Sequence, residues 1–255
     1  MKAYCMIRDM PWYRRESFVA GLEALGYDVT RNEEIAPGNI CIVWNRYGVY
    51  EATARRYESA GLPVIVAENG YLGRDWRGEH WYALARGGHN GSGKWKIGGP
   101  ERWNSLNVEL APWRQDGSEV VILATRHIGV RGVAEPYGWG HSVAEKIARV
   151  WRLPVRIRQH PGENNCVPLQ EDLKNAKAVV SWGSGASLKA MVWGIPAVYG
   201  YRDWIGADAA TPIDVFLARA LNLVQDRVRM FQRLAWAMWR TDEIATGEPF
   251  KCLLA

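Results

Sequence analysis

Small and hydroxyl-bearing side chains gather in residues 181–187, Ser-Trp-Gly-Ser-Gly-Ala-Ser. The segment joins an expected strand to an expected helix, so its backbone can approach a ligand closely. Because the free N–H groups at a helix start attract phosphate, we regard Ser184, Gly185 and Ser187 as candidate phosphate contacts. The same residues also suit an ordinary turn in which a serine caps the helix. The sequence leaves both interpretations open.

Two further side chains follow expected strands in the same half of the chain. His160 comes soon after the strand 155–158, and Arg126 soon after the strand 120–124. The carboxyl ends of parallel strands meet at one sheet edge, where open α/β sheets bind their ligands. A guanidinium at this edge can hold a diphosphate with two parallel hydrogen bonds. We therefore expect His160 and Arg126 to share one site with the serine-glycine turn, against the alternative of ordinary structural or surface roles.

A glycine-rich segment in the first half interleaves cations with indole rings. Lys94, Lys96 and Arg102 alternate with Trp95 and Trp103. A nucleic-acid groove uses cations on phosphates and aromatic rings stacked on bases. The sequence thus predicts a mobile DNA-binding loop, and the alternative is a folded loop whose tryptophans lie in a small core.

Residues 88–94 of this segment also satisfy the pattern G-x-x-x-x-G-K of a nucleotide-binding P-loop. The pattern requires Ser or Thr at the next position, where this chain has Trp95. A P-loop also follows a strand, whereas residues 80–86 are expected to form a helix. We therefore exclude an ATPase.

Short apolar strands and helical segments alternate along the chain, which is typical of parallel sheets covered by helices. We predict strands at 3–8, 40–44, 63–67, 120–124, 155–158, 178–181 and 197–199, and helices at 14–25, 51–60, 142–151, 169–175 and 186–193. The expected fold is α/β, with Rossmann-like domains at 1–112 and 113–225 separated by a cleft. Residues 226–255 are expected to pack back on the first domain through a helix at 226–240.

The composition limits the class of protein. The 255 residues include 32 basic and 27 acidic side chains, and the net charge of +5 favours anions such as nucleotides or nucleic acid. No apolar stretch approaches the roughly 20 residues that cross a bilayer, and the N-terminus lacks the apolar region of a signal peptide. The four cysteines have no metal-binding spacing, so we expect free thiols in a reducing cytoplasm. We expect no membrane partner, and a monomer or homodimer.

The His-Pro pair at 160–161 and the serine run that ends in Gly-Ile-Pro-Ala-Val at 194–198 resemble the donor-nucleotide half of GT-B glycosyltransferases. The similarity is greatest to the capsular-polysaccharide-synthesis type, in which His-Pro and serine motifs hold the phosphates of a nucleotide sugar. The resemblance implies phosphate contacts at His160, Ser184 and Ser187. Lys189 stands where many relatives have an acidic residue for the ribose, which leaves the nucleotide base open.

Other segments resemble small phage-encoded glycosyltransferases, some of which act on hydroxymethylated pyrimidines in viral DNA. These segments are VAENGYLGRDW at 66–76, GGHNGSG at 87–93 and RLAWAMWRTDEIATGEPF at 233–250. The two resemblances imply a GT-B-like fold and a hexosyl- or pentosyltransferase. A UDP-sugar is the first choice of donor, and neither a further cofactor nor a metal is expected, since no D-x-D element stands in a suitable turn.

An inverting glycosyl transfer needs a base that takes the proton of the acceptor hydroxyl. Glu68 closes the strand 63–67 and is our first choice of base, because Gly70 and Gly73 after it leave room for a substrate. Asp9, Asp75 and His89 lie in other loops of the first domain and are the alternatives. A retaining transfer would need no such base.

The sequence therefore predicts a cytoplasmic GT-B glycosyltransferase, in the host cytoplasm if the protein is phage-encoded. The expected acceptor is the hydroxymethylpyrimidine of phage DNA, such as 5-hydroxymethylcytosine. The alternatives are a transferase of surface or capsular polysaccharide and a catalytically inactive module that binds nucleotide or DNA.

Overall fold

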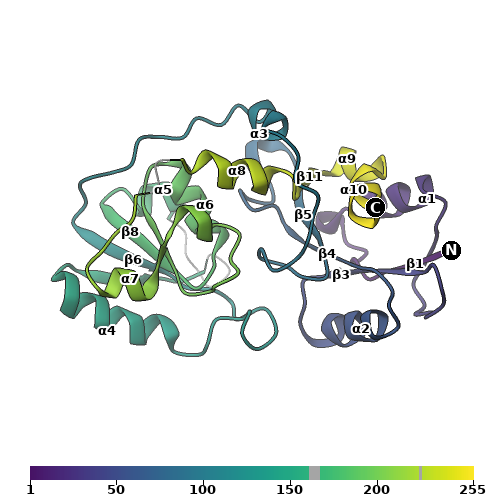
Figure 1. Cartoon of the computed structure of the whole chain (residues 1–255), viewed down its shortest axis with the longest axis horizontal. Coiled ribbons are helices and arrows are strands. Elements are labelled where there is room, and N and C mark those ends of the chain that lie inside the picture. Colours follow the sequence, from purple (N-terminus) through teal and green to yellow (C-terminus); the bar gives the residue numbers. More distant parts are fainter. Residues whose placement is uncertain (161–166, 224–225) are drawn as a thin grey trace. The chain divides into compact units, whose positions relative to one another are not determined.

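The computed structural model describes residues 1–160, 167–223 and 226–255. They form two compact units, one of residues 1–100 with 233–255 and one of residues 101–232 (Figure 1). Pro161, which belongs to the predicted His-Pro motif, and Cys166 lie outside the described residues. Each unit is an α/β layer structure built on one sheet.

The first unit contains a six-stranded sheet in the order β11-β5-β4-β3-β1-β2. The strands are β1 Lys2–Cys5, β2 Asp28–Thr30, β3 Ile40–Trp44, β4 Val64–Asn69, β5 Trp81–Arg86 and β11 Met238–Arg240. The strands β1 to β4 are parallel, whereas β5 runs antiparallel to both β4 and β11. The helix expected at 80–86 is therefore wrong. Its apolar side chains are buried in a strand that pairs on both sides.

The helices of the first unit are α1 Arg15–Ala24, α2 Gly48–Ser59, α9 Thr241–Ala245 and α10 Glu248–Leu254, with short 3-10 turns at Pro11–Tyr13 and Trp76–Gly78. Figure 1 shows α1 and α2 on opposite faces of this sheet. The chain's last residues pack on α1, where Gly21 meets the end of α9. A Cβ atom on Gly21 would lie 1.9 Å from the carbonyl oxygen of Ile244. Residues 233–255 thus belong to the first unit.

We expect Gly21→Ala to lower the free energy of unfolding by about 1–3 kcal/mol, because the added methyl group must push α1 away from α9. Urea denaturation followed by circular dichroism measures this change. Ala20→Ser, on the exposed side of the same helix, is the control and should change the free energy by less than about 0.5 kcal/mol. An equal stability of the two variants would contradict the close helix contact.

The second unit contains a five-stranded parallel sheet in the order β10-β9-β8-β6-β7. Its strands are β6 Glu119–Leu123, β7 Val155–Arg158, β8 Ala176–Ser181, β9 Ala197–Tyr199 and β10 Thr211–Pro212. The helices are α3 Glu101–Ser105, α4 Trp139–Trp151, α5 Leu169–Asp172, α6 Gly185–Val192 and α7 Ile213–Leu217, with a 3-10 turn at Ala207–Ala209. Helix α8 Val228–Ala235 ends where the chain enters the first unit.

The first unit ends twelve residues before the predicted boundary at 112 because residues 101–114 are fastened to the second unit. The amide of Ala111 donates to the carbonyl of Val192 at 3.0 Å, and the Trp103 ring stacks on Phe231 with 4.8 Å between centroids. The expected helix at 226–240 is also interrupted. It ends at Ala235, and β11 follows it as an edge strand.

Two of the thiols lie in the core of the first unit. Cys5 and Cys41 are free and buried on neighbouring strands, as the sequence predicts. In the described part of the chain, no helix is long and apolar enough to cross a membrane.

Candidate functional site

The carboxyl edge of the second sheet carries the residues predicted to hold the donor. Strand β6 lies between β7 and β8, so the chain leaves β6 on one side and returns on the other. Ligands of open α/β sheets bind at such a switch point. Arg126 is exposed in the loop that follows β6, and His160 is half-buried after β7. Both residues therefore follow neighbouring strands of this sheet, and their contact with a donor stays a prediction.

The serines of 181–187 have mainly structural hydrogen bonds. Ser184 is the N-cap of α6, and its Oγ accepts the amide of Ala186 at 3.2 Å. Ser187 lies fully buried, with its Oγ 2.9 Å from that of Ser181. The predicted contact of Ser187 with a phosphate is therefore not open in this structure, because one helical turn carries the hydroxyl from the loop into the core. Gly185 is the first residue of α6, where its backbone remains half-buried.

Lys189 is half-buried on α6 without an ion pair to any described residue. Burial lowers the pKa of its ammonium group, and no carboxylate opposes this shift. The position thus has a basic residue where the resemblance suggests an acidic one.

The proposed base Glu68 is half-buried at the end of β4. Its Oε1 accepts the backbone amide of Asn90 at 2.6 Å and the phenol of Tyr71 at 3.0 Å. Burial raises the pKa of Glu68 to about 7, although both hydrogen bonds favour the ionised form. Burial and the neighbouring Glu68 charge raise the pKa of Tyr71 well above its usual value, so Tyr71 remains a hydrogen-bond donor. A carboxyl with a pKa near neutrality can take up and release a proton at the working pH.

The alternative bases have other partners. Asp9 is exposed and paired with Arg31. Arg74 holds the pKa of Asp75 below its usual value, which makes this carboxylate a weaker base. His89 is buried, and its carbonyl accepts the hydroxyl of Ser92 at 2.7 Å. These environments leave Glu68 as the carboxylate best suited to proton transfer.

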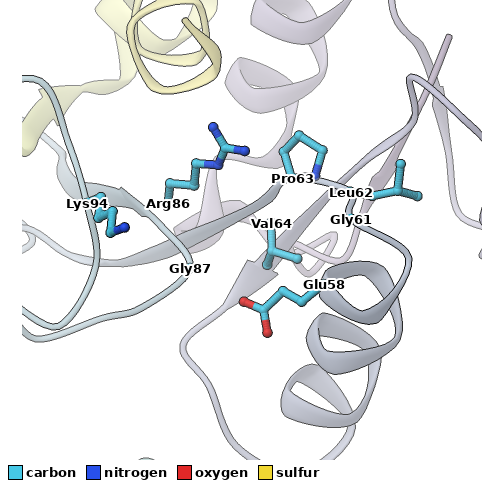
Figure 2. A pocket seen from close by; sticks show the side chains of 8 residues that line it. All are labelled: Glu58, Gly61, Leu62, Pro63, Val64, Arg86, Gly87 and Lys94. Carbon is cyan, nitrogen blue, oxygen red and sulfur yellow. The ribbon is translucent and has the colours of Figure 1, made fainter.

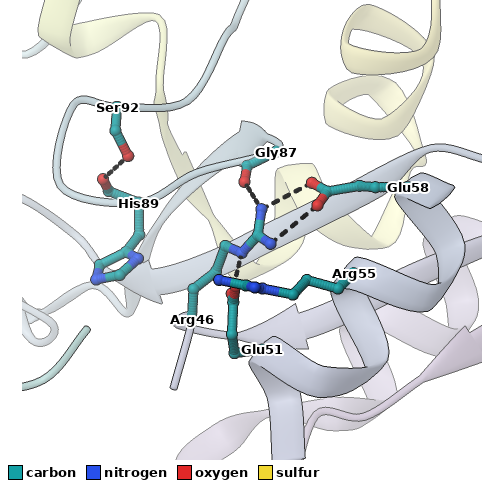
Figure 3. Close-up of polar contacts among 7 residues, drawn as sticks. All are labelled: Arg46, Glu51, Arg55, Glu58, Gly87, His89 and Ser92. Atoms are coloured by element: carbon teal, nitrogen blue, oxygen red, sulfur yellow. Dashed lines mark hydrogen bonds and ion pairs between the residues drawn. The ribbon is translucent and has the colours of Figure 1, made fainter. Parts of the chain in front are cut away.

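An arginine anchors the loop that carries Asn90 to Glu68. Arg46 donates to Glu51 at 2.6 Å, to both carboxylate oxygens of Glu58 at 2.7 and 2.9 Å, and to the carbonyl of Gly87 (Figure 3). Because Gly87 begins this loop, the ion pairs of Arg46 help to position the amide that binds Glu68.

Lys94 lies at the opposite end of β4 from Glu68. It lines a pocket of about 530 Å³ together with Arg86 and Glu58 (Figure 2). Its backbone pairs with that of Arg86 in an antiparallel bridge. Since the pocket reaches β4 at Val64, four residues before Glu68, it lies about 13 Å along the strand from the candidate base.

The remaining residues of the predicted DNA-binding loop belong to two different units. Trp95 packs against the first core, and its indole N–H donates to the carbonyl of Arg233 at 3.1 Å. Lys96 is exposed in the same unit, whereas Arg102 lies on α3 in the second unit. Trp103 is buried. Trp103 therefore lies in a core and Trp95 packs against one, which agrees with the alternative for this segment.

We expect Trp95→Ala to lower the free energy of unfolding by about 1–3 kcal/mol, because it removes the packing of a half-buried ring and a part-buried hydrogen bond. The comparison variant is Trp12→Ala, since Trp12 is 49% exposed and its loss should cost less than about 0.5 kcal/mol. Thermal or urea unfolding of both variants gives the difference. If Trp95→Ala had normal stability, the ring would not be part of the packing, and the interpretation of Trp95 as a stacking surface for bases would be favoured again.

The comparisons with solved structures cover both units. One match is the β-Kdo 2,4-transferase KpsC of Thermosulfurimonas dismutans, with a TM-score of 0.56 and 9% identity over 93% of this chain and 91% of that chain. Another is the KpsC β-Kdo 2,7-transferase of the same organism, with a TM-score of 0.57 and 13% identity over 97% and 98%. The fold is GT-B-like. No family model and no curated protein matches the sequence.

One buried acid of the second unit is not among the predicted site residues. Glu135 is buried beside the β6 loop, where its carboxylate accepts the amide and hydroxyl of Thr125 at 3.1 and 2.7 Å. Its carbonyl accepts the His127 ring N–H at 2.7 Å. The only signal in the sequence is an acidic residue in the loop between β6 and α4. Among the residues described, no cluster of three or more His, Cys, Asp or Glu side chains could hold a metal ion.

Proposed function

We propose that the protein is a glycosyltransferase that moves a hexosyl or pentosyl group from a nucleotide sugar to a hydroxyl group. The observation that carries the proposal is Glu68, a half-buried carboxyl group with a pKa of about 7 at a strand end of a GT-B-like fold. Perturbed carboxyl groups of this kind are typical of catalytic sites. The likeness to two Kdo transferases adds support for transferase chemistry.

The second unit would bind the donor, for which a UDP-sugar is the first choice. Arg126 and His160 follow neighbouring strands, β6 and β7, and can contact the phosphates. The N-terminus of the thirteen-residue helix α4 has no side-chain cap and lies on the same edge. Its free amides favour negative charge. No further cofactor is part of the proposal.

In the proposed inverting reaction, the acceptor oxygen attacks C1 of the donor sugar while Glu68 takes the proton of the hydroxyl group. The new C1–O bond forms as the bond from C1 to the phosphate oxygen breaks. The electron pair of that bond leaves with the nucleotide, and Arg126 and His160 offset the added negative charge. The proton then leaves Glu68 for solvent.

We favour a saccharide acceptor over hydroxymethylated DNA. The two solved neighbours are Kdo transferases. Of the two tryptophans expected to stack on bases, Trp103 is buried and Trp95 packs against the first core. The DNA acceptor was predicted from the cationic loop and the phage-type resemblance, and it remains the second candidate because Lys94 and Lys96 are exposed.

Calorimetric titration with nucleotide sugars of each common base tests the donor. We expect saturable binding of at least one nucleotide sugar, and absence of binding across the panel would contradict the proposal. DNA titrations at several salt concentrations test the acceptor. A DNA enzyme would prefer hydroxymethylated DNA and lose affinity with a slope of about −0.9 per phosphate contact in log salt. A saccharide enzyme would show neither property.

A further inference from the structure

A second pocket of the first unit lies at the carboxyl end of β1, and the proposed transfer does not yet use it. Its volume is about 290 Å³, and its lining includes the end of β1, the first residue of α1 and the first turn of α2. Strand β1 lies between β2 and β3, so the chain passes from β1 to β2 on one side and then returns to β3 on the other. The pocket therefore occupies the switch point of the first sheet, the place where open α/β sheets bind ligands.

The side chains around this pocket are mostly cationic. Arg8, Arg15 and Arg31 line it, and Asp9 is the single acid among its described lining residues. Asp9 is already paired with Arg31. Arg15 is half-buried and has no ion pair with a described residue. The pocket thus has a surplus of positive charge that no described carboxylate balances.

The pocket has charged side chains around apolar residues at the end of β1, an arrangement that suits a polar ligand. Arg8 is held in place, since its Nε donates to the phenol of Tyr50 at 3.1 Å and its guanidinium lies 5.9 Å from the Tyr13 ring. The charges of Arg15 and Arg31 both act on the buried thiol of Cys5 at the base of the pocket. All three arginines are thus lining residues of the same pocket.

Two helix starts reinforce the charge of these arginines. The ten-residue helix α1 and the twelve-residue helix α2 both begin at this edge, and neither has a side-chain cap. The free amides of a helix N-terminus favour an anion. They add to the arginines but would not define a site without them.

We propose that this pocket binds a carboxylate or phosphate group, held by Arg8, Arg15 and Arg31. The anion is part of the acceptor, so the enzyme acts on an acidic or phosphorylated saccharide. This assignment rests on the proposed function. Guanidinium groups hold both anions with paired, charge-assisted hydrogen bonds. The binding of the anion does not depend on catalysis and can be measured alone.

The test is a calorimetric or NMR titration of the protein with glucuronate, glucose 6-phosphate and neutral glucose. We expect at least one of the two anionic sugars to bind at least about tenfold more tightly than glucose, which corresponds to one charge-assisted hydrogen bond. The stronger of the two identifies carboxylate or phosphate as the recognised group. Equal affinity for all three sugars would overturn the proposal.

Variants of the pocket show where the anion binds. Arg15→Gln should lower the affinity for the anionic sugar about tenfold or more. Arg149→Gln is the control, because Arg149 is exposed on α4 in the second unit. Val49 is 63% exposed at the pocket, in the first turn of α2. Val49→Glu should also abolish the preference for the anionic sugar, whereas Val49→Gln, whose side chain has the shape of glutamate without its charge, should keep it. A preference that survives both Arg15→Gln and Val49→Glu would place the anion elsewhere.

The outcomes separate this inference from the proposed function. Sugar transfer without any preference for an anionic acceptor would contradict the proposed anion site and support the proposed transferase function. Anion binding that Arg15→Gln abolishes, in a protein that transfers no sugar, would support the anion site and contradict the transferase function.

Discussion

Glu68→Gln is expected to lower turnover by about 100-fold or more while donor affinity is preserved. The amide keeps the shape of the side chain but cannot accept the proton of the acceptor hydroxyl. The hydrogen bond from the Asn90 amide can persist on the remaining carbonyl oxygen, so the fold should not change. Steady-state turnover and a donor titration measure the two quantities separately.

Asp75→Asn is the matched control, since Asp75 is an exposed carboxylate of the same unit, paired with Arg74. It should retain turnover within about threefold, because that carboxylate is not placed to act as the base. If Glu68→Gln kept near-normal turnover while Asp75→Asn or Asp9→Asn did not, the choice of base would be wrong and the class of enzyme would survive.

The raised pKa of Glu68 also predicts how activity depends on pH. Only the ionised carboxylate can act as a base, so turnover should rise with pH and reach half its maximum near the pKa of about 7. The residual turnover of Glu68→Gln should not show this rise with pH. A turnover that falls as pH rises from 6 to 8 would contradict the assignment of Glu68 as the base.

The same pKa has a consequence for stability that needs no substrate. Because the folded pKa of about 7 exceeds the value of about 4.3 in an unfolded chain, the fold binds the extra proton. The stability that protonated Glu68 contributes is fully present below about pH 4.3 and is lost as pH rises through about 7. The unfolding free energy of the natural protein should therefore fall relative to that of Glu68→Gln over this range.

His160→Ala is expected to lower the affinity for the nucleotide sugar by about 5- to 150-fold. This loss is equivalent to one hydrogen bond to a charged group, about 1–3 kcal/mol. His160 is half-buried after β7, so its removal should leave the fold intact. Calorimetry on His160→Ala and Arg126→Ala measures the loss. Arg149→Gln, on the exposed surface of α4, should bind normally. Unchanged affinity in both edge variants would remove the assignment of the donor site.

The sequence predicts best those strands that begin at a clear signal. β3, β7 and β9 have the expected bounds, and Pro154 and Pro196 stand directly before the last two. Trp81–Arg86 was misassigned because a short apolar run is compatible with either a helix or a buried strand. β11 was missed because its partner β5 lies more than 150 residues earlier in the chain.

The candidate site was predictable only in part. Strand ends locate Glu68, Arg126 and His160, because parallel strands bring their carboxyl ends together. The burial of Ser187 depends on how α6 packs on its sheet, and the support of Glu68 comes from a backbone amide that any residue could supply. The pocket at β1 joins residues from four separate segments, each unremarkable alone.

The most direct test of the account is the mass of the acceptor after incubation with a nucleotide-sugar panel. The acceptors are an acidic oligosaccharide, its neutral counterpart and hydroxymethylated DNA, which is digested to nucleosides before weighing. We predict that the acidic oligosaccharide gains the mass of one sugar with release of one nucleotide, and that Glu68→Gln suppresses this gain. No gain of mass in any acceptor, with every donor recovered intact, would contradict the assignment of this protein as a glycosyltransferase.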